Sequence, residues 1–312
     1  MKLESLSVVV PCYRSRESLP ELVDLIEKNS QGLTDNLKII LVDDGCPDNS
    51  WEMIEEIGKT NRRVVGIKLS KNFGQHYAIT AGLKLSKSEA TIVMDCDLQD
   101  HPKFFPDLIR QFHNGYRIVF TKKKTREHPF IKNIFGLIFH KIFNFLVSNN
   151  ETNKEIGNFS LLDKHARECF CRIEDYQRHY LLVLRWIGFS STVVSIDHYE
   201  RHSGLSSYTF LKSLKHAVNG IVGQSNRLLY FSTMIAFVVL VLSTLGAAAL
   251  IVSKIYFNYQ EGWVSLVVVM LFSLALMLFS VGINGLYISR IFDQVKNRPL
   301  FIIDKIASHE DL

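Results

Sequence analysis

The chain has 312 residues, enough for one large domain or two smaller ones, and its 47% hydrophobic content is high for a sequence with 21% charged residues. The charge is segregated, because residues 228–289 are nearly uncharged. A formal net charge of +5, dispersed along the chain, is too weak to indicate nucleic-acid binding and suggests a mild preference for phosphates or a lipid surface.

Strand and helix patterns alternate along the first hundred residues. The predicted strands are residues 6–10, 37–42, 64–69 and 91–94, and the predicted helices are residues 17–29, 50–59 and 77–85. This alternation predicts an α/β fold, with a mostly parallel sheet and helices on both faces. Neither G-x-G-x-x-G after the first strand nor G-x-x-x-x-G-K-[ST] occurs, so neither a dinucleotide-binding fold nor a P-loop is supported. No signal peptide is expected, because residues 1–4 lead straight into the first strand.

Polar groups follow each of the four predicted strands. The turns are P-C-Y-R at 11–14, D-D-G at 43–45, K-N-F-G-Q at 71–75 and D-C-D at 95–97. Any one of them could be ordinary turn chemistry. The carboxyl ends of parallel strands, however, meet at the edge where open α/β sheets bind ligands. Four such turns together therefore predict a site at that edge.

The turn after the fourth strand is the most acidic. Asp95 and Asp97 are followed by Gln99 and Asp100. Strict strand alternation would point Asp95 and Asp97 to the same side. Carboxylate and amide oxygens clustered this tightly suit a hard cation such as Mg²⁺ or Mn²⁺. The alternative interpretation is a solvated acidic turn, because D-x-D is a common sequence.

Several stretches resemble one family. VVVPCYRSRESL, ILVDDGCPDNSW, LSKNFGQHYAITAGL and DCDLQD closely resemble family 2 inverting glycosyltransferases with the GT-A fold. The subgroup that they most resemble is the polyprenyl-phosphate glycosyltransferases, which include bactoprenol glucosyltransferases and dolichol-phosphate mannose synthases. The resemblance continues in R-x-x-G-x-S-x-Y at 201–208 and in the tail YISRIFDQVKNRPLFII. It covers nearly the whole chain and implies a GT-A nucleotide-sugar-binding domain.

The resemblance implies a role for each matching residue. The residues implied to hold the nucleotide-sugar are Pro11, Tyr13, Asp43, Asp44, Asn72, Gln75 and Asp95. Those implied to bind Mg²⁺ or Mn²⁺ are Asp95, Asp97 and Gln99, and those implied to be catalytic are Asp95, Asp97 and Arg201. The acceptor and its phosphate are implied to contact Arg201, Ser206 and Tyr208. The alternative for Arg201 is a loop arginine in a surface ion pair.

This sequence departs from the family pattern at two places. Arg14, Ser15 and Arg16 stand where the family often has Asn-Glu, so recognition near the nucleoside can differ. Asp100 stands where a histidine is common in the mannose synthases, which argues against mannose as the transferred sugar.

The middle of the chain carries a membrane-like pattern. The spacing of residues 129–147 predicts a broad apolar helix with a narrow polar stripe, and a basic tract precedes them at 122–126. This pattern predicts an amphipathic helix in a membrane interface, and the alternative is a core helix of a soluble domain. Residues 181–189 are predicted to be buried.

Two long apolar stretches follow. No charged residue occurs in 228–253 or in 262–289, and each stretch exceeds the roughly 20 residues that cross a bilayer. Lys and Arg flank the pair, which predicts a transmembrane hairpin with both termini in the cytoplasm. The alternative is a soluble apolar hairpin. We therefore expect a cytoplasmic domain at 1–204, a juxtamembrane helix at 205–227 and a cytoplasmic tail at 290–312 of an inner-membrane, multi-pass protein.

The expected function is sugar transfer. The resemblance implies that a UDP- or GDP-linked sugar moves to polyprenyl (undecaprenyl) phosphate on the cytoplasmic face, for modification of cell-surface glycans or lipopolysaccharide. The expected partners are nucleotide-sugar, polyprenyl phosphate, membrane lipids and a second copy of the chain, without nucleic acid. The alternatives are a glycosyltransferase with another lipid or polysaccharide acceptor, and a non-catalytic membrane scaffold or lipid-carrier transporter.

Overall fold

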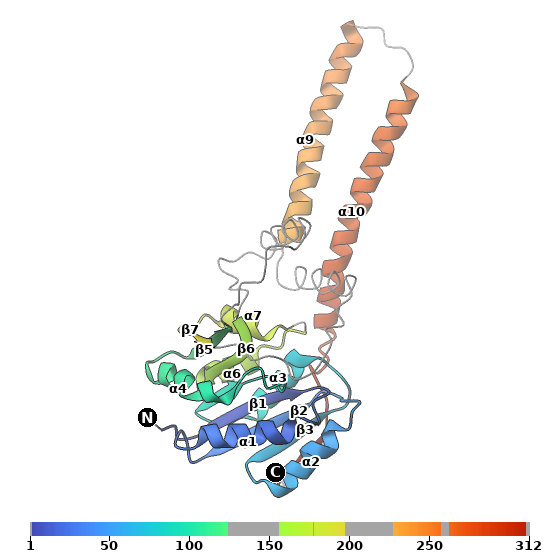
Figure 1. Ribbon diagram of the computed structural model, residues 1–312. Helices are drawn as coiled ribbons and strands as arrows, with labels where there is room; N and C mark the ends of the chain where they lie inside the picture. The colour runs from blue at the N-terminus through green and yellow to red at the C-terminus, as the bar shows by residue number, and fades with distance from the viewer. Residues whose placement is uncertain (1, 124–155, 177, 197–226, 257–261, 310–312) are drawn as a thin grey trace, which may run out of the picture. The chain divides into compact units, whose positions relative to one another are not determined.

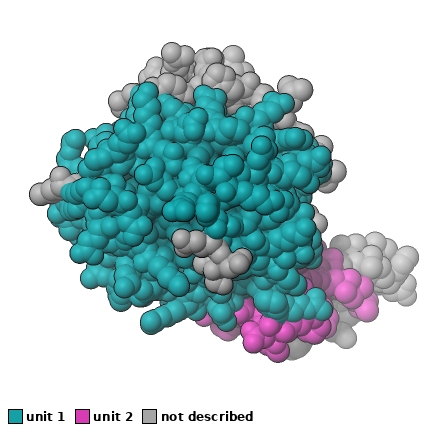
Figure 2. Space-filling view, turned by 90° about the horizontal axis from the view of Figure 1, so that it is seen from below, with its two compact units in different colours: residues 1–129, 153–205, 298–312 teal, residues 130–152, 206–297 magenta. Residues whose placement is uncertain are grey.

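The computed structural model describes residues 2–123, 156–176, 178–196, 227–256 and 262–309. The chain divides into two compact units (Figure 2). The first unit is formed by residues 1–129, 153–205 and 298–312, and the second by residues 130–152 and 206–297. The first unit therefore contains chain from both sides of the second unit.

An eight-stranded sheet forms the centre of the first unit, in the order β7-β5-β6-β4-β1-β2-β3-β8 (Figure 1). The strands are β1 (Leu6–Cys12), β2 (Leu37–Asp43), β3 (Val64–Leu69), β4 (Ala90–Val93), β5 (Ile118–Lys123), β6 (Ile156–Asp163), β7 (Ser191–Ile196) and β8 (Ile303–Ala307). Strands β1 to β4 are mutually parallel, whereas β6 and β8 run antiparallel to their neighbours. The sheet is therefore mostly parallel, as predicted.

Helices cover both faces of the sheet. They are α1 (Leu19–Ser30), α2 (Ser50–Thr60), α3 (Gln75–Leu85), η1 (Pro102–Phe104), α4 (Phe105–His113), α6 (Lys164–Arg172) and α7 (Tyr180–Ile187). One buried apolar cluster packs α1, α2 and α4 against one face, and a second packs α3, α6 and α7 against the other. This arrangement confirms the predicted fold class.

The predicted elements of the first hundred residues match the structure to within two residues at each end. One prediction further along the chain is wrong in part. Residues 181–189 lie mostly in α7, where Val183 and Leu184 are buried but the Trp186 side chain is 79% exposed. One face of α7 packs against the apolar cluster that covers the sheet, and its other face is exposed.

The last strand brings the end of the chain back to the sheet. Strand β8 pairs antiparallel with β3, so that Ile303 lies opposite Leu69 at the carboxyl end of β3. Just beyond this pair, the Ser70 N–H donates to the Ile302 carbonyl oxygen at 2.9 Å. Residues 303–307, expected only as a tail, are thus an edge strand of the same sheet.

The second unit contains two long helices, α9 (Arg227–Tyr256, 30 residues) and α10 (Trp263–Val295, 33 residues). Within them, Leu229–Gly246 and Phe272–Val295 are long and apolar enough to cross a membrane by length and composition. Large apolar side chains such as Phe237 are exposed, which is unfavourable in water and suits a lipid environment. The helices predicted at 129–147 and 205–227 lie outside the described residues.

Candidate functional site

The carboxyl ends of β1, β2 and β4 meet at one edge of the sheet. Cys12 at the end of β1 lies opposite Asp43 at the end of β2, and the Asp44 N–H donates to the Cys12 carbonyl at 3.0 Å. On the other side of β1, the Met94 N–H donates to the Val9 carbonyl at 3.1 Å. Strands β2 and β3 lie on one side of β1, and the chain then crosses to the other side of β1 to form β4. Such a switch point is where open α/β sheets bind ligands.

The two adjacent carboxylates after β2 have different hydrogen bonds. Oδ1 and Oδ2 of Asp44 accept from the backbone N–H groups of Phe73 and Gly74 at 2.8 and 2.9 Å. Oδ1 of Asp43 accepts from the Cys46 N–H at 3.0 Å, but its buried Oδ2 has no hydrogen-bond partner among the described residues. Burial raises the pKa of Asp43 and raises that of Asp44 to about 6. Asp43 is therefore the carboxylate that retains an unused acceptor.

Because Asp44 is buried with a raised pKa, we expect its contribution to the free energy of unfolding to depend on pH. Its folded-state pKa of about 6 lies above the value of about 3.9 in an unfolded chain. Protonation therefore favours folding, so the contribution is full below about pH 4 and is lost as the pH rises through about 6. As the pH is lowered from well above 6 to below about 4, we expect the free energy of unfolding of the wild-type protein to rise by up to about 3 kcal/mol relative to that of Asp44→Asn. Urea unfolding at several pH values would measure this difference. A constant difference would contradict this, and the exposed Asp24→Asn is the control.

The loop between β3 and α3 approaches the turn after β2 closely. Gly45 has φ +63°, and a Cβ added there would lie 2.5 Å from the Asn72 nitrogen and 2.6 Å from the Lys71 carbonyl carbon. Both atoms belong to the backbone and cannot rotate away. Only glycine therefore allows the D-D-G turn to lie against this loop.

We accordingly expect Gly45→Ala to weaken donor binding at least about 10-fold and to destabilise the fold by about 2 kcal/mol, because the loop must move to admit the methyl group. Isothermal titration with the nucleotide and thermal unfolding would measure the two effects. The matched control is Gly32→Ala, since Gly32 also has positive φ, +77°, but has no atom within 4 Å of the added Cβ. Equal effects of the two substitutions would assign the loss to backbone strain alone.

The acidic turn after β4 is held by hydrogen bonds within the turn and by one from the start of α3. Oδ1 of Asp95 accepts from Gln75 Nε2 at 2.7 Å, and Oδ1 of Asp97 accepts from the Gln99 N–H at 3.2 Å. Leu98 adopts φ +61°, and Asp100 Oδ2 accepts from the Asp95 N–H at 3.4 Å. Asp95 and Asp97 thus lie beyond the end of β4, so strand alternation does not orient them; the turn does.

Sequence reasoning missed two supports of this turn. Asp100, noted in the acidic turn and as a departure from the family pattern but given no role of its own, is 3% exposed and closes the turn onto Asp95. Ser18, just before α1, donates from its Oγ to the Cys96 carbonyl at 3.0 Å. The place of Asp100 in the acidic run after the fourth strand was the signal available in the sequence, whereas no local pattern pointed to Ser18.

The other predicted donor-site residues differ in exposure. Pro11 is buried at the end of β1, whereas Tyr13 is 45% exposed and Asn72 and Gln75 are exposed. The Arg14 guanidinium carbon lies 5.6 Å from the centroid of the Tyr13 ring. The predicted acceptor-side residues, namely Arg201, Ser206 and Tyr208, lie outside the described residues.

A second set of contacts fixes the start of α3. The Tyr180 N–H donates to His76 Nδ1 at 3.4 Å, and the rings of His76 and His179 have centroids 4.1 Å apart. The Tyr77 hydroxyl donates to the Tyr176 carbonyl. Burial lowers the pKa of His76 to about 3, so it accepts this hydrogen bond as a neutral ring. These contacts tie α3, which begins at Gln75, to the start of α7.

The acidic turn offers ligands of one chemical kind. In the part of the chain that the structure describes, no group of three or more His, Cys, Asp or Glu side chains could hold a metal ion. The oxygens of Asp95, Asp97 and Gln99 nevertheless fit Mg²⁺ or Mn²⁺, because Mg²⁺ usually takes one or two carboxylates and completes its coordination with water and substrate phosphates. The turn is suited to a cation that binds together with a diphosphate.

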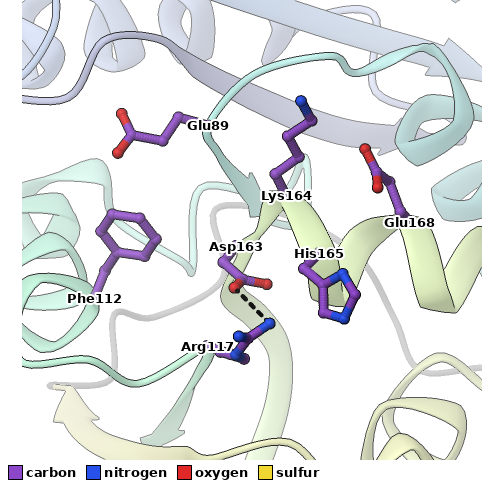
Figure 3. Close-up of a pocket in the computed structure, with 7 residues that line it drawn as sticks. All are labelled: Glu89, Phe112, Arg117, Asp163, Lys164, His165 and Glu168. Atoms are coloured by element: carbon purple, nitrogen blue, oxygen red, sulfur yellow. Dashed lines mark ion pairs between the residues drawn. The ribbon is translucent and has the colours of Figure 1, made fainter.

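A pocket of about 450 Å³ lies elsewhere in the first unit (Figure 3). Its lining residues are Glu89, Phe112, Arg117, Asp163, Lys164, His165 and Glu168. Glu89 precedes β4 and Asp163 ends the antiparallel β6, which places the pocket at the opposite edge of the sheet from Asp95. Two of its charged residues pair with each other, with Arg117 Nη1 3.6 Å from Asp163 Oδ2. The pocket is therefore separate from the candidate site.

The fold and the acidic switch point are those of an α/β domain whose candidate ligand site lies at the carboxyl edge of the sheet. The sequence profile of Glycosyl transferase family 2 matches residues 7–169. The chain belongs to this family and is a glycosyltransferase, which confirms the family indicated by the sequence motifs.

Relatives match along nearly the whole chain. Uncharacterized glycosyltransferase YkoT of Bacillus subtilis is 33% identical over 98% of this chain and 93% of its own length. Undecaprenyl-phosphate 4-deoxy-4-formamido-L-arabinose transferase of Proteus mirabilis is 28% identical, covering 98% and 95% of the two chains. The SfII prophage-derived bactoprenol glucosyl transferase of Shigella flexneri is 29% identical, covering 96% and 97%. The relatives thus include enzymes named for transfer to a polyprenyl phosphate.

Proposed function

We propose that this glycosyltransferase is a membrane-bound, inverting enzyme that moves a sugar from a UDP- or GDP-linked donor to a polyprenyl phosphate such as undecaprenyl phosphate. The observation that carries the proposal is the convergence of the Asp43-Asp44 and Asp95–Asp97 turns on one edge of the sheet, where the loop before α3 joins them by hydrogen bonds. The names of two relatives support the acceptor. The lipid-linked sugar that this reaction makes would serve as the sugar donor for modification of cell-surface glycans.

The donor would occupy the edge formed by β1, β2 and β4. Oδ2 of Asp43 is the acceptor that the described residues leave unsatisfied, so it suits an N–H group of a nucleoside base. The half-exposed Tyr13 ring offers a face on which a base can stack. Asp95, Asp97 and Gln99 would hold a divalent cation, which when bound neutralises charge on the leaving diphosphate.

The transfer itself requires little proton chemistry. The anomeric carbon loses its bond to the nucleoside diphosphate and gains one to an oxygen of the acceptor phosphate, with inversion of configuration. A phosphate monoester has a second pKa near 6, so the attacking oxygen is largely ionised at neutral pH and needs no strong general base. We propose that Arg201, with Ser206 and Tyr208, holds the phosphates, as a planar guanidinium does well.

The membrane assignment rests on α9 and α10. Their length, composition and exposed apolar side chains support two bilayer spans. We propose a domain at 1–204, a connecting helix at 205–227, spans that begin at 228 and a return after them. The second apolar stretch, Phe272–Val295, runs past the end predicted at residue 289. An acceptor with a lipid tail also requires an enzyme at a membrane. The predicted homo-oligomer remains a prediction.

The sheet constrains the topology of these spans. Strand β1 precedes α9 and β8 follows α10, yet both belong to one sheet. The chain must therefore cross the membrane an even number of times between them. We expect a reporter at position 258 to face the periplasm or lumen, and reporters at positions 1 and 312 to face the cytoplasm. A cytoplasmic signal at 258 would contradict the hairpin.

The test of the proposed function is direct. Detergent-purified protein would be incubated with undecaprenyl phosphate, Mg²⁺ or Mn²⁺ and a panel of UDP- and GDP-sugars, and the lipid product would be weighed by mass spectrometry. We expect one donor to add one hexose-sized mass to the lipid phosphate. Transfer only to diacylglycerol or to a polysaccharide, offered in parallel, would replace the proposed acceptor.

A further inference from the structure

The role of Asp44 differs from the one that the family resemblance implies. The resemblance places Asp43 and Asp44 together at the nucleoside. In the structure Asp44 is 3% exposed, and both of its oxygens accept backbone N–H groups of a loop 29 and 30 residues further along the chain. A carboxylate held in this way at 2.8 and 2.9 Å is directed at the loop and not at a ligand.

The loop that Asp44 holds leads directly to the acidic turn. Phe73 and Gly74 donate to Asp44, and the next residue, Gln75, begins α3 and donates from Nε2 to Asp95 Oδ1 at 2.7 Å. Gly74 has φ +108°, a conformation that strongly favours glycine, so the chain turns sharply between the Asp44 contacts and Gln75. The position of the Gln75 side chain therefore depends on that of the loop.

The loop has little freedom to compensate for a loss of Asp44. Its first residue, Ser70, donates to the Ile302 carbonyl of the C-terminal segment at 2.9 Å. Its middle lies against Gly45, at a distance that would not admit a Cβ. Asp44 provides the contact at the remaining end, next to Gln75. Loss of that contact would release the end of the loop that reaches Asp95.

We propose that Asp44 is a positioning residue, which acts through the Phe73–Gly74 backbone and the Gln75 side chain to orient Asp95 for the cation that accompanies the donor diphosphate. The inference rests on the proposed function, because it assigns Asp95 to a cation. It separates two adjacent acidic residues by their hydrogen bonds and not by their exposure, since both are buried. Asp44 uses both oxygens on the loop and serves the metal-binding turn from a distance, whereas Asp43 keeps the acceptor that the proposed function assigns to the nucleoside.

A double-mutant cycle tests this coupling in the full-length protein. The variants are Asp44→Asn, Gln75→Met and the double substitution, and the measurement is the Kd of Mn²⁺ by isothermal titration in the presence of saturating UDP or GDP. We expect each single substitution to weaken Mn²⁺ binding about 10-fold, as loss of a residue that orients a metal ligand does. The double variant should be no weaker than the weaker single variant.

Two further readouts distinguish positioning from nucleoside binding. Metal-free binding of uridine or guanosine should weaken in Asp43→Asn and stay unchanged in Asp44→Asn. Hydrogen exchange at the Phe73 or the Gly74 amide should speed up in Asp44→Asn but not in Gln75→Met, because only the former replaces one of the two acceptor oxygens of these amides by an NH2 group. If Asp44→Asn does not fold, Asp44→Glu, which keeps the charge and displaces the oxygens, takes its place in the cycle.

The outcomes separate the inference from the function on which it rests. Losses that multiply in the double variant, or weaker nucleoside binding in Asp44→Asn, would overturn the positioning role while leaving the enzyme a glycosyltransferase of the proposed kind. Wild-type protein that binds neither nucleotide nor Mn²⁺ would instead overturn the proposed donor site, and the inference with it.

Discussion

Replacing Asp97 by Ala should reduce sugar transfer at least about 1,000-fold, the scale of loss when charge at a reacting centre is left uncompensated. Asp97 and Asp95 are the two candidate metal-ligating carboxylates of the turn after β4, and Asp97 Oδ1 also accepts from the Gln99 N–H. Its loss removes a cation ligand and loosens the turn that presents Gln99. The rate of lipid-product formation at saturating donor measures the effect.

The same experiment has a chemical counterpart. Excess EDTA should abolish transfer by the wild-type enzyme, and added Mg²⁺ or Mn²⁺ should restore it, since the described side chains alone do not complete a metal site. The matched control is Asp107→Ala on α4, which removes a carboxylate paired with Arg110 at 3.2 Å on the surface and should leave the rate unchanged. Full activity in excess chelator would exclude a role for the cation.

The parallel half of the fold could be predicted from local patterns. Strands such as residues 6–10 and 37–42 are apolar runs buried on both faces of the sheet, so their sequences show it directly. The edge strand β8 could not be predicted in this way. Four of its five residues are exposed, and its burial comes from pairing with β3, which lies more than 200 residues away in the sequence. A pattern confined to one segment carries no information about such a partner.

The candidate site shows the same division. The residue types at the strand ends indicated the chemistry, because carboxylates and amides at a switch point suit a nucleotide and a cation. Their individual roles required the structure, since Asp43 and Asp44 are adjacent and identical in type. The contact between Asp44 and Phe73 spans 29 residues, and that between Gln75 and Asp95 spans 20. Only the folded chain shows which carboxylate the loop uses.

Strand β8 provides the second large effect that we expect. Ala307 is 8% exposed and lies against Gly58 of α2 and Gly66 of β3, where the missing side chains admit it. Removing residues 298–312 would expose this surface and the edge of β3, and Ser70 would lose the Ile302 carbonyl at the start of the donor loop. The four paired positions contribute on the order of 4 kcal/mol at about 1 kcal/mol per hydrogen bond.

For a domain of this size, such a loss should lower the midpoint of thermal unfolding by about 10 °C. Donor affinity should also fall at least about 10-fold, because the loop that carries Phe73 and Gly74 is then fixed at one end only. Removing residues 309–312 alone leaves β8 intact and should change neither quantity. The longer truncation could instead lower the unfolding midpoint as expected and leave donor affinity unchanged. That result would show that β8 stabilises the sheet without shaping the loop. The hydrogen bond between Ser70 and Ile302 would then have no part in donor binding.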